Sequence, residues 1–192
     1  MNKQATKELF SKIEQSVDKL VQNFKEFPDI YLTEEDARTH LFSLILKNSS
    51  LCRTLFNTQD GTKSTPLHSE IRWYGNSGKL KYRSDIVILD PRTMITKKSL
   101  SLPSKGYGFN HFYAIIEIKL RRVNGKSDNK FSEEIVKEIE KLNRIRAETK
   151  LANKYNPLTI LICLDKRNNI SNKLPHISED DIEIRYALGD IK

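Results

Sequence analysis

The chain has 192 residues, of which 38% are hydrophobic and 30% charged, which is enough for one domain with a packed core. No apolar run approaches the roughly 20 residues needed to cross a bilayer, and the polar start MNKQATKELF lacks the apolar centre of a signal peptide. Only two cysteines occur, and they do not form a CxxC pair, which disfavours a zinc site. We therefore expect a cytoplasmic protein with no membrane partner.

The charge balance is strongly basic, with a net charge of +8 and a pI near 9.4. A basic surface attracts polyanions, and nucleic acid is the commonest polyanion inside a cell. The charge alone does not identify a partner, but it supports a nucleic-acid function if basic residues surround a reactive site.

Two helices are predicted before the first strand. Residues 3–27 carry apolar residues at helical spacing and end before Pro28. A second helix is expected to begin after Thr33, a good N-cap, with Asp36 completing a capping box in place of the usual Glu or Gln.

The rest of the chain alternates between strand and helix patterns. The order α-α-β-β-β-α-β-β predicts an α/β fold with a mixed β-sheet flanked by helices, in a single domain spanning 1–192. In chain order we expect strands at 66–75 and 79–90 around a turn at 75–78, an irregular segment at 92–110, a strand at 112–120, a helix at 133–154 capped by Ser132, a buried strand at 158–165 and an edge strand at 181–188.

A charged pair interrupts the most apolar of the early strands. In YAIIEIKLRR, residues 113–122, Glu117 and Lys119 share one face of the strand, because side chains alternate between the two faces. Asp85 begins the apolar part of RSDIVILD and faces Glu117 if the two strands pair. Two neighbouring carboxylates repel, and a divalent cation relieves that repulsion, so the pattern suggests a Mg²⁺ or Mn²⁺ site. The alternative is structural: Glu117 pairs with Lys119 or Arg83, and Asp85 caps a strand end.

These residues resemble the motif of the PD-(D/E)xK nuclease superfamily, also called restriction-endonuclease-like. The two halves of the motif are Ser84-Asp85 and Glu117-Ile118-Lys119, with serine where the namesake motif has proline. The superfamily's core order, a helix, a strand hairpin, a strand, a crossover helix and a further strand, matches residues 34–165.

The resemblance implies a role for each motif residue. Asp85, Glu117 and the Ile118 carbonyl would hold Mg²⁺ or Mn²⁺, which binds a phosphate oxygen and lowers the pKa of a water. Lys119 would position that water or help to deprotonate it, and would offset charge on the phosphate. The implied reaction cuts a phosphodiester bond and leaves a 5′-phosphate.

The superfamily often adds an acid from the helix before the sheet. Glu34 lies three, four and seven residues before Ala37, Arg38 and Leu41, so it shares their inward stripe and is the preferred candidate. Glu35 is a close second, and Glu70 on the strand before Asp85 is a third candidate. The alternative for the helix acids is that they only favour the positive end of the helix.

Basic residues beside the motif are expected to bind the phosphate backbone of DNA. The candidates are Arg83, Arg121, Arg122 and Lys126, and the alternative for each is a solvated surface charge. We expect the loop 121–130 to grip substrate and to be disordered without it.

The leading functional prediction is a Mg²⁺-dependent deoxyribonuclease. Its small size and basic charge suit structure-selective cleavage, as in junction resolvases, and such enzymes are often homodimers. The N-terminal segment 1–30 is either the dimer surface or a cover for the sheet. The competing prediction is a nucleic-acid-binding or assembly protein with the same fold and no catalysis. The sequence does not distinguish DNA from RNA, or endonuclease from exonuclease activity.

Overall fold

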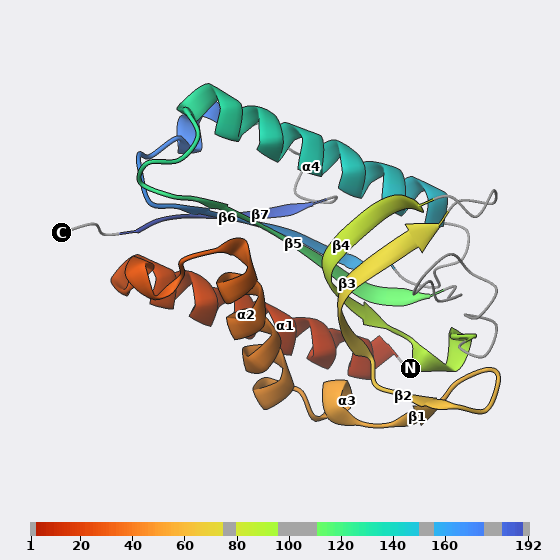
Figure 1. The fold of residues 1–192 in the computed structure, drawn as a ribbon. Coiled ribbons are helices and arrows are strands. Elements are labelled where there is room, and N and C mark those ends of the chain that lie inside the picture. The colour runs from red at the N-terminus through yellow and green to blue at the C-terminus, as the bar shows by residue number, and fades with distance from the viewer. Residues whose placement is uncertain (1–2, 75–79, 96–110, 150–155, 175–181, 190–192) are drawn as a thin grey trace.

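A five-stranded mixed β-sheet forms the centre of the computed structural model, which describes residues 3–74, 80–95, 111–149, 156–174 and 182–189. The strands lie in the order β3-β4-β5-β6-β7. Helix α4 covers one face of the sheet, and α1 and α2 cover the other (Figure 1). The predicted mixed α/β architecture is therefore confirmed.

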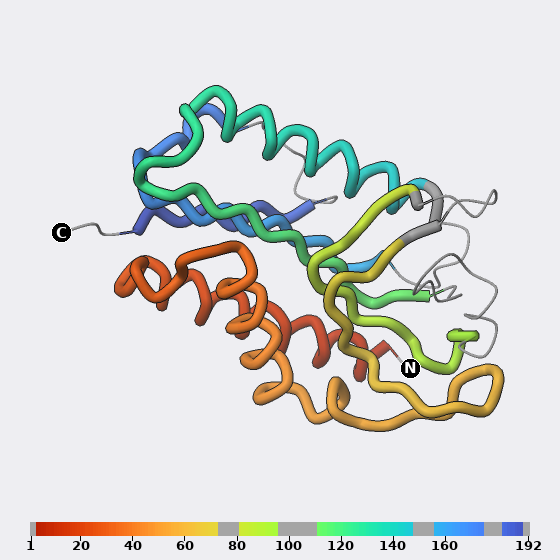
Figure 2. Tube along the Cα trace, in the orientation of Figure 1, coloured from red at the N-terminus to blue at the C-terminus, as the bar shows by residue number. Residues whose placement is uncertain are grey.

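The first half of the sheet is antiparallel. Strands β3 (Leu67–Tyr74), β4 (Leu80–Leu89) and β5 (Phe112–Arg121) match the three strands predicted before the long helix. The β3–β4 hairpin curves away from the plane of the other strands (Figure 2).

The second half is parallel and is built by a β5–α4–β6 crossover, as predicted. Strand β6 (Leu158–Asp165) is buried between β5 and β7 (Glu183–Leu188), and β7 is an edge strand. Helix α4 (Asp128–Thr149) begins five residues before its predicted start. The prediction of Ser132 as its N-cap is wrong, because Ser127 precedes the helix and its hydroxyl accepts the Lys130 N–H at 3.4 Å.

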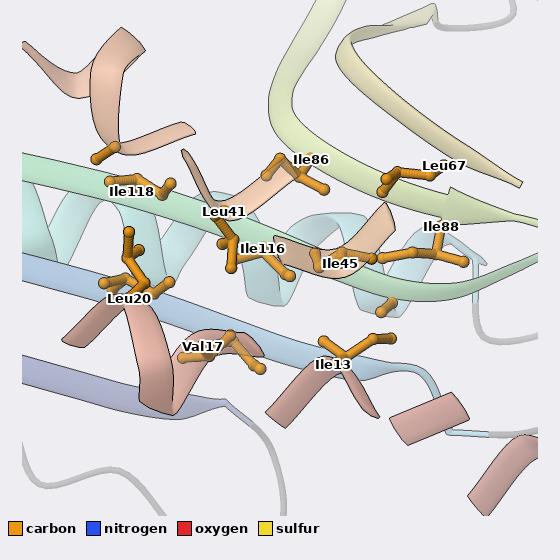
Figure 3. Packing of buried hydrophobic residues seen from close by; sticks show 14 of the residues in the cluster. Ile13, Val17, Leu20, Leu41, Ile45, Leu67, Ile86, Ile88, Ile116 and Ile118 are labelled. Carbon is orange, nitrogen blue, oxygen red and sulfur yellow. The ribbon is translucent and has the colours of Figure 1, made fainter. Parts of the chain in front are cut away.

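Both helices at the N-terminus pack on the sheet. Helix α1 (Lys3–Glu26) buries Ile13, Val17 and Leu20 on the β6–β7 side of the sheet, and α2 (Glu34–Asn48) buries Leu41 and Ile45 over β3, β4 and β5 (Figure 3). The capping box is confirmed, because Thr33 accepts the Asp36 N–H and Asp36 accepts the Thr33 N–H. The apolar face of α1 therefore covers the sheet, which is one of the two alternatives that the sequence left open for this segment.

Helix α4 covers the opposite face with a second apolar layer. Its buried residues are Phe131, Ile135, Ile139, Leu142 and Ile145. They pack with Val87 of β4 and Ile115 of β5, which point to the α4 side of the sheet. Because side chains alternate along a strand, Asp85 and Glu117 belong to this same side.

Several short elements complete the fold. They are η1 (Pro28–Ile30), α3 (Ser50–Arg53), the two-stranded ribbon of β1 (Phe56–Asn57) and β2 (Lys63–Ser64), η2 (Pro91–Thr93) and η4 (Ser171–Lys173). The predicted turn at 75–78, most of 92–110 and the last residues of the predicted helix 133–154 lie outside the described residues. No helix in the described ranges has the length and apolarity needed to cross a membrane.

Candidate functional site

Three acidic side chains lie in one row across β3, β4 and β5. Glu70 is placed opposite Asp85 by the β3–β4 register. The β4–β5 ladder ends at the pair Ile86–Ile116, so that Asp85 and Glu117 are opposite at the next position. We call Glu70, Asp85 and Glu117 the carboxylate row.

The backbone departs from regular sheet geometry at this row. Side chains replace the ladder between β4 and β5: Asp85 Oδ2 accepts the Ile118 N–H at 2.8 Å, and the Asp85 N–H donates to Glu117 Oε2 at 3.4 Å. Glu70 has a φ of 55°, in the left-handed region that a side chain other than glycine rarely adopts. Such strain at a position with an acidic neighbour is typical of functional sites.

Glu117 is the most deeply buried member of the row, with 1% of its surface exposed. Its Oε1 lies 3.0 Å from the Lys141 ammonium of α4. Burial raises the pKa of Glu117 to about 8, since Lys141 offsets only part of the desolvation while Asp85 and Glu138 add repulsion. Ionisation of Glu117 therefore costs free energy in this environment, and a further positive charge would reduce that cost.

Lys119 also meets acidic groups on both sides. Its ammonium is 3.1 Å from Glu138 and 4.0 Å from Glu34. Burial opposes its charge, but Glu138, Glu34 and Asp85 outweigh burial and raise the pKa of Lys119. Lys119 is therefore a fixed cation in this structure and not a free base.

Arg38 of α2 lies on the side of the row away from Lys141. Its guanidinium pairs with Glu35, Glu70 and Asp85, and its distance to Asp85 Oδ1 is 3.3 Å. Arg83 pairs with Glu70 at 3.1 Å, while its own carbonyl accepts from Lys141 at 2.8 Å. The row is thus enclosed by cations from a strand and from two helices.

A cleft of about 610 Å³ opens at the row. It is lined by Thr33, Glu34, Glu35, Arg38, Glu70, Asp85, Leu120, Arg121, Arg122, Asn124, Gly125 and Lys126. These residues come from the N-cap and start of α2, from the distorted positions of β3 and β4, and from the end of β5 with the loop that follows it. Asp85 and Glu70 reach the cleft wall, whereas Glu117 and Lys119 are not among its lining residues.

The ion pairs around the row carry more negative than positive charge. Within the described part of the chain, they join six carboxylates and four cations. The carboxylates are Glu34, Glu35, Glu70, Asp85, Glu117 and Glu138, and the cations are Arg38, Arg83, Lys119 and Lys141. With every group ionised, the network has a net charge of −2, whereas the whole chain has a net charge of +8.

The residues of the row fit a divalent cation in charge and in donor chemistry. A hard cation such as Mg²⁺ takes oxygen ligands and needs only one or two carboxylates, with water completing its shell. Burial and repulsion at Glu117 are the costs that such a cation would reduce. Across the described ranges, however, no three or more acidic, histidine or cysteine side chains are arranged to hold a metal. Ile118 meets Asp85 through its N–H, and the structure does not assign its carbonyl to the site.

The three acids at the start of α2 point in the directions that the helical geometry predicts. Glu34 lines the cleft, where its Oε1 accepts the Leu120 N–H at 3.2 Å. Glu35 also lines the cleft but is turned to Arg38, and Asp36 serves as the cap. Glu70, the third candidate acid, lines the same cleft and is brought against Asp85 through Arg38.

The prediction of Arg121 as a DNA contact is wrong. Its side chain is fully buried and donates to Asp165 at 2.9 and 2.6 Å and to Asp128 at 2.7 Å. In the sequence, Arg121 is one of two adjacent arginines. Its buried partner Asp165 lies 44 residues away, so the local sequence does not show the ion pair.

The other predicted phosphate contacts are exposed. Arg122 and Lys126 line the cleft, and Arg83 is half-exposed while pairing with Glu70. The expectation of a disordered loop is not met, since 121–130 has a defined path that includes the last residue of β5 and the start of α4. Two carbonyls of this loop, those of Gly125 and Lys126, each accept from Arg167 at 3.2 Å.

Three charged residues at the site were not predicted. Glu138 and Lys141 lie one turn apart on α4 and bind Lys119 and Glu117, respectively, and Arg38 bridges α2 to the row. The spacing of Glu138 and Lys141 on one helical face was a usable signal. Nothing in the local sequence indicated that this face meets β5.

No protein-family model, curated protein or solved structure matches this chain.

Proposed function

We propose that this protein is a metal-dependent nuclease that hydrolyses phosphodiester bonds in DNA on a restriction-endonuclease-like sheet. One observation carries the proposal: Asp85 and Glu117 from adjacent strands meet where those strands separate, with Asp85 on the wall of a cleft. Lys119 lies two residues after Glu117 on the same side of β5. We also propose that the protein acts in the cytoplasm and as a homodimer.

The residues of the site divide the chemistry among them. Asp85 and Glu117 would hold Mg²⁺ or Mn²⁺, which when bound supplies an activated water and neutralises phosphate charge. Lys119 stays protonated, since its pKa is raised, so its role is to orient the water and to offset charge that develops on the phosphate. Glu34 orients Lys119 from the cleft side, at 4.0 Å.

The rim of the cleft supplies affinity without sequence selection. Arg122 and Lys126 line the cleft beside the acidic row, and we expect them to contact the neighbouring phosphates of a bound strand. Such contacts give affinity and register. They suit cleavage that depends on the shape of the DNA, as in junction resolvases.

A second candidate is a nucleic-acid-binding or assembly protein that does not cut. It is favoured by the ion pairs of Arg38 with Asp85 and of Lys141 with Glu117, which compensate both carboxylates within the protein itself. If these pairs never open, the row is a structural feature of the sheet.

Incubation of supercoiled and branched DNA with Mg²⁺ or Mn²⁺ separates the two candidates. We expect cleavage by the wild type and a loss of at least roughly 100-fold in Asp85→Asn and Lys119→Met, the size typical of lost electrostatic stabilisation. Asp90→Asn is the matched control, because Asp90 follows β4 at its other end and pairs with Arg92 at 2.7 Å. DNA left equally intact by all four proteins, but bound by them, would favour the second candidate.

A further inference from the structure

We propose that Arg38 is an exchangeable counter-ion that competes with the divalent cation for the carboxylates of Glu70 and Asp85. This inference rests on the proposed function, and it assigns a regulatory role to a residue outside the nuclease motif. In the absence of the metal, the guanidinium holds these carboxylates together. Entry of the cation and departure of the guanidinium are then linked events.

The first support is the number of carboxylates that Arg38 contacts. A single guanidinium pairs with Glu35 on its own helix, with Glu70 on β3 and with Asp85 on β4. Its side chain is only 13% exposed. The planar guanidinium has five N–H donors and remains charged at all relevant pH values, so it can compensate several acids at once.

The second support is the division of the two proposed metal ligands between two cations. Asp85 is paired with Arg38 of α2, and Glu117 is paired with Lys141 of α4. A metal ion that joins Asp85 to Glu117 must therefore share Asp85 with the guanidinium. Because both are cations, each lowers the affinity of the site for the other, and the coupling is reciprocal.

The surroundings indicate which of the two cations gives way. Each cation has two partners besides its proposed metal-ligand carboxylate: Arg38 has Glu35 and Glu70, and Lys141 has the Arg83 carbonyl at 2.8 Å and Glu138. The difference lies in access to the cleft, because Lys141 is not among its lining residues. Arg38 instead lines the cleft, and its partner Glu35 is 63% exposed. Turning toward Glu35 moves the guanidinium away from Asp85 while keeping one ion pair and gaining contact with water.

Calorimetric titration of the full chain with MnCl₂ tests this competition. We expect Arg38→Met to bind Mn²⁺ at least ~5-fold more tightly than the wild type, which is the lower end of typical coupling between sites. Arg92→Met is the matched control, because it removes an arginine that pairs with Asp90 at the far end of β4, and it should leave the Mn²⁺ affinity unchanged. Equal or weaker binding by Arg38→Met would overturn the inference.

Two further variants keep the test decisive. Arg38→Lys retains the charge but loses the guanidinium that bridges the acids. We expect it to bind Mn²⁺ more tightly than the wild type and less tightly than Arg38→Met. It also keeps the test available if Arg38→Met folds poorly. Asp85→Asn should lose Mn²⁺ binding. If Asp85→Asn loses binding while both Arg38 variants match the wild type, only the inference fails. If no protein binds Mn²⁺ at millimolar concentration, the proposed function fails with it.

Discussion

At Arg121, strand β5 ends in a closed set of ion pairs, whereas at Glu117, four residues earlier, it meets the open carboxylate row. The closed set, which we call the arginine cluster, consists of Arg121, Asp128, Asp165 and Lys173. It contains two acids and two cations. Arg121 and Asp165 are completely buried, and the Tyr186 hydroxyl donates a further hydrogen bond to Asp165 at 2.8 Å.

The carboxylate row differs in charge balance, exposure and backbone geometry. Its ion-pair network has more acids than cations, one edge opens to a cleft, and Glu70 is in a strained conformation. A balanced and fully hydrogen-bonded buried cluster is satisfied without a ligand and makes the local structure rigid, and removal of one of its charges leaves the other buried and unpaired. An unbalanced cluster at a cleft has a free-energy cost that ligand binding can remove. The comparison therefore supports a structural role for Arg121 and the proposed functional role of Asp85 and Glu117.

The largest expected effect is on stability, at the arginine cluster. Arg121→Met leaves Asp165 buried without its cation, and we expect it to lower the free energy of unfolding by about 3–5 kcal/mol. Urea denaturation measures the loss. The exposed neighbour Arg122→Met is the control and should change stability by less than about 0.5 kcal/mol. A stable Arg121→Met protein that no longer binds DNA would instead restore Arg121 as a phosphate contact.

The next effect is a pH dependence at Glu117. The folded protein raises the pKa of this carboxyl from 4.5 to about 8, so between these values the folded state keeps a proton that the unfolded state releases. Stability contributed by this group therefore falls as the pH rises from about 4.5 to about 8. Glu117→Gln cannot titrate, and we expect its stability to fall less over this range.

Urea denaturation at pH 5 and pH 8, with a chelator present, measures this difference. Glu140→Gln serves as the control, because Glu140 is exposed on α4 and pairs with Arg144 on the same helix. Parallel pH profiles for the wild type and Glu117→Gln would show that Glu117 keeps no proton in the folded protein over this range, and would contradict the raised pKa of this carboxyl.

The smallest effect on stability is expected at the rim of the cleft. Arg122→Ala and Lys126→Ala remove exposed side chains, so each should change the free energy of unfolding by less than about 0.5 kcal/mol. Each should reduce the slope of log affinity for duplex DNA against log salt by about 0.9, the value for one lost phosphate contact. Fluorescence anisotropy at several salt concentrations measures the slope, and an unchanged slope would exclude these two residues from the DNA contact.

The local sequence predicted the main elements and the meeting of Asp85 with Glu117, but not the other contacts that complete the site. Alternation of side chains was enough to place Glu117 and Lys119 on one face of β5, and the capping pattern was enough to place Asp36 at the start of α2. The pairing of Glu70 with Asp85 through Arg38 depends on the register of β3 and on the packing of α2 beside it. Neither of these leaves a signal in the neighbouring residues.

Buried charge was the main obstacle to assigning roles from sequence. Arg121 and Arg122 are adjacent and chemically identical, yet one is completely buried and the other is exposed at the cleft. The difference comes from Asp165 at the end of β6 and from Asp128 at the start of α4, which meet Arg121 only after the crossover has formed. A residue's role here depends on the acids that the fold brings to it.

A crystal structure of the protein grown with Mn²⁺ tests the central claim most directly. The account predicts an anomalous-scattering peak bound to the carboxylates of Asp85 and Glu117, with the Arg38 guanidinium moved away from Asp85. A map with no peak at these carboxylates, while Arg38 and Lys141 keep the ion pairs they have now, would contradict it. The carboxylate row would then have a purely structural role, as the arginine cluster does.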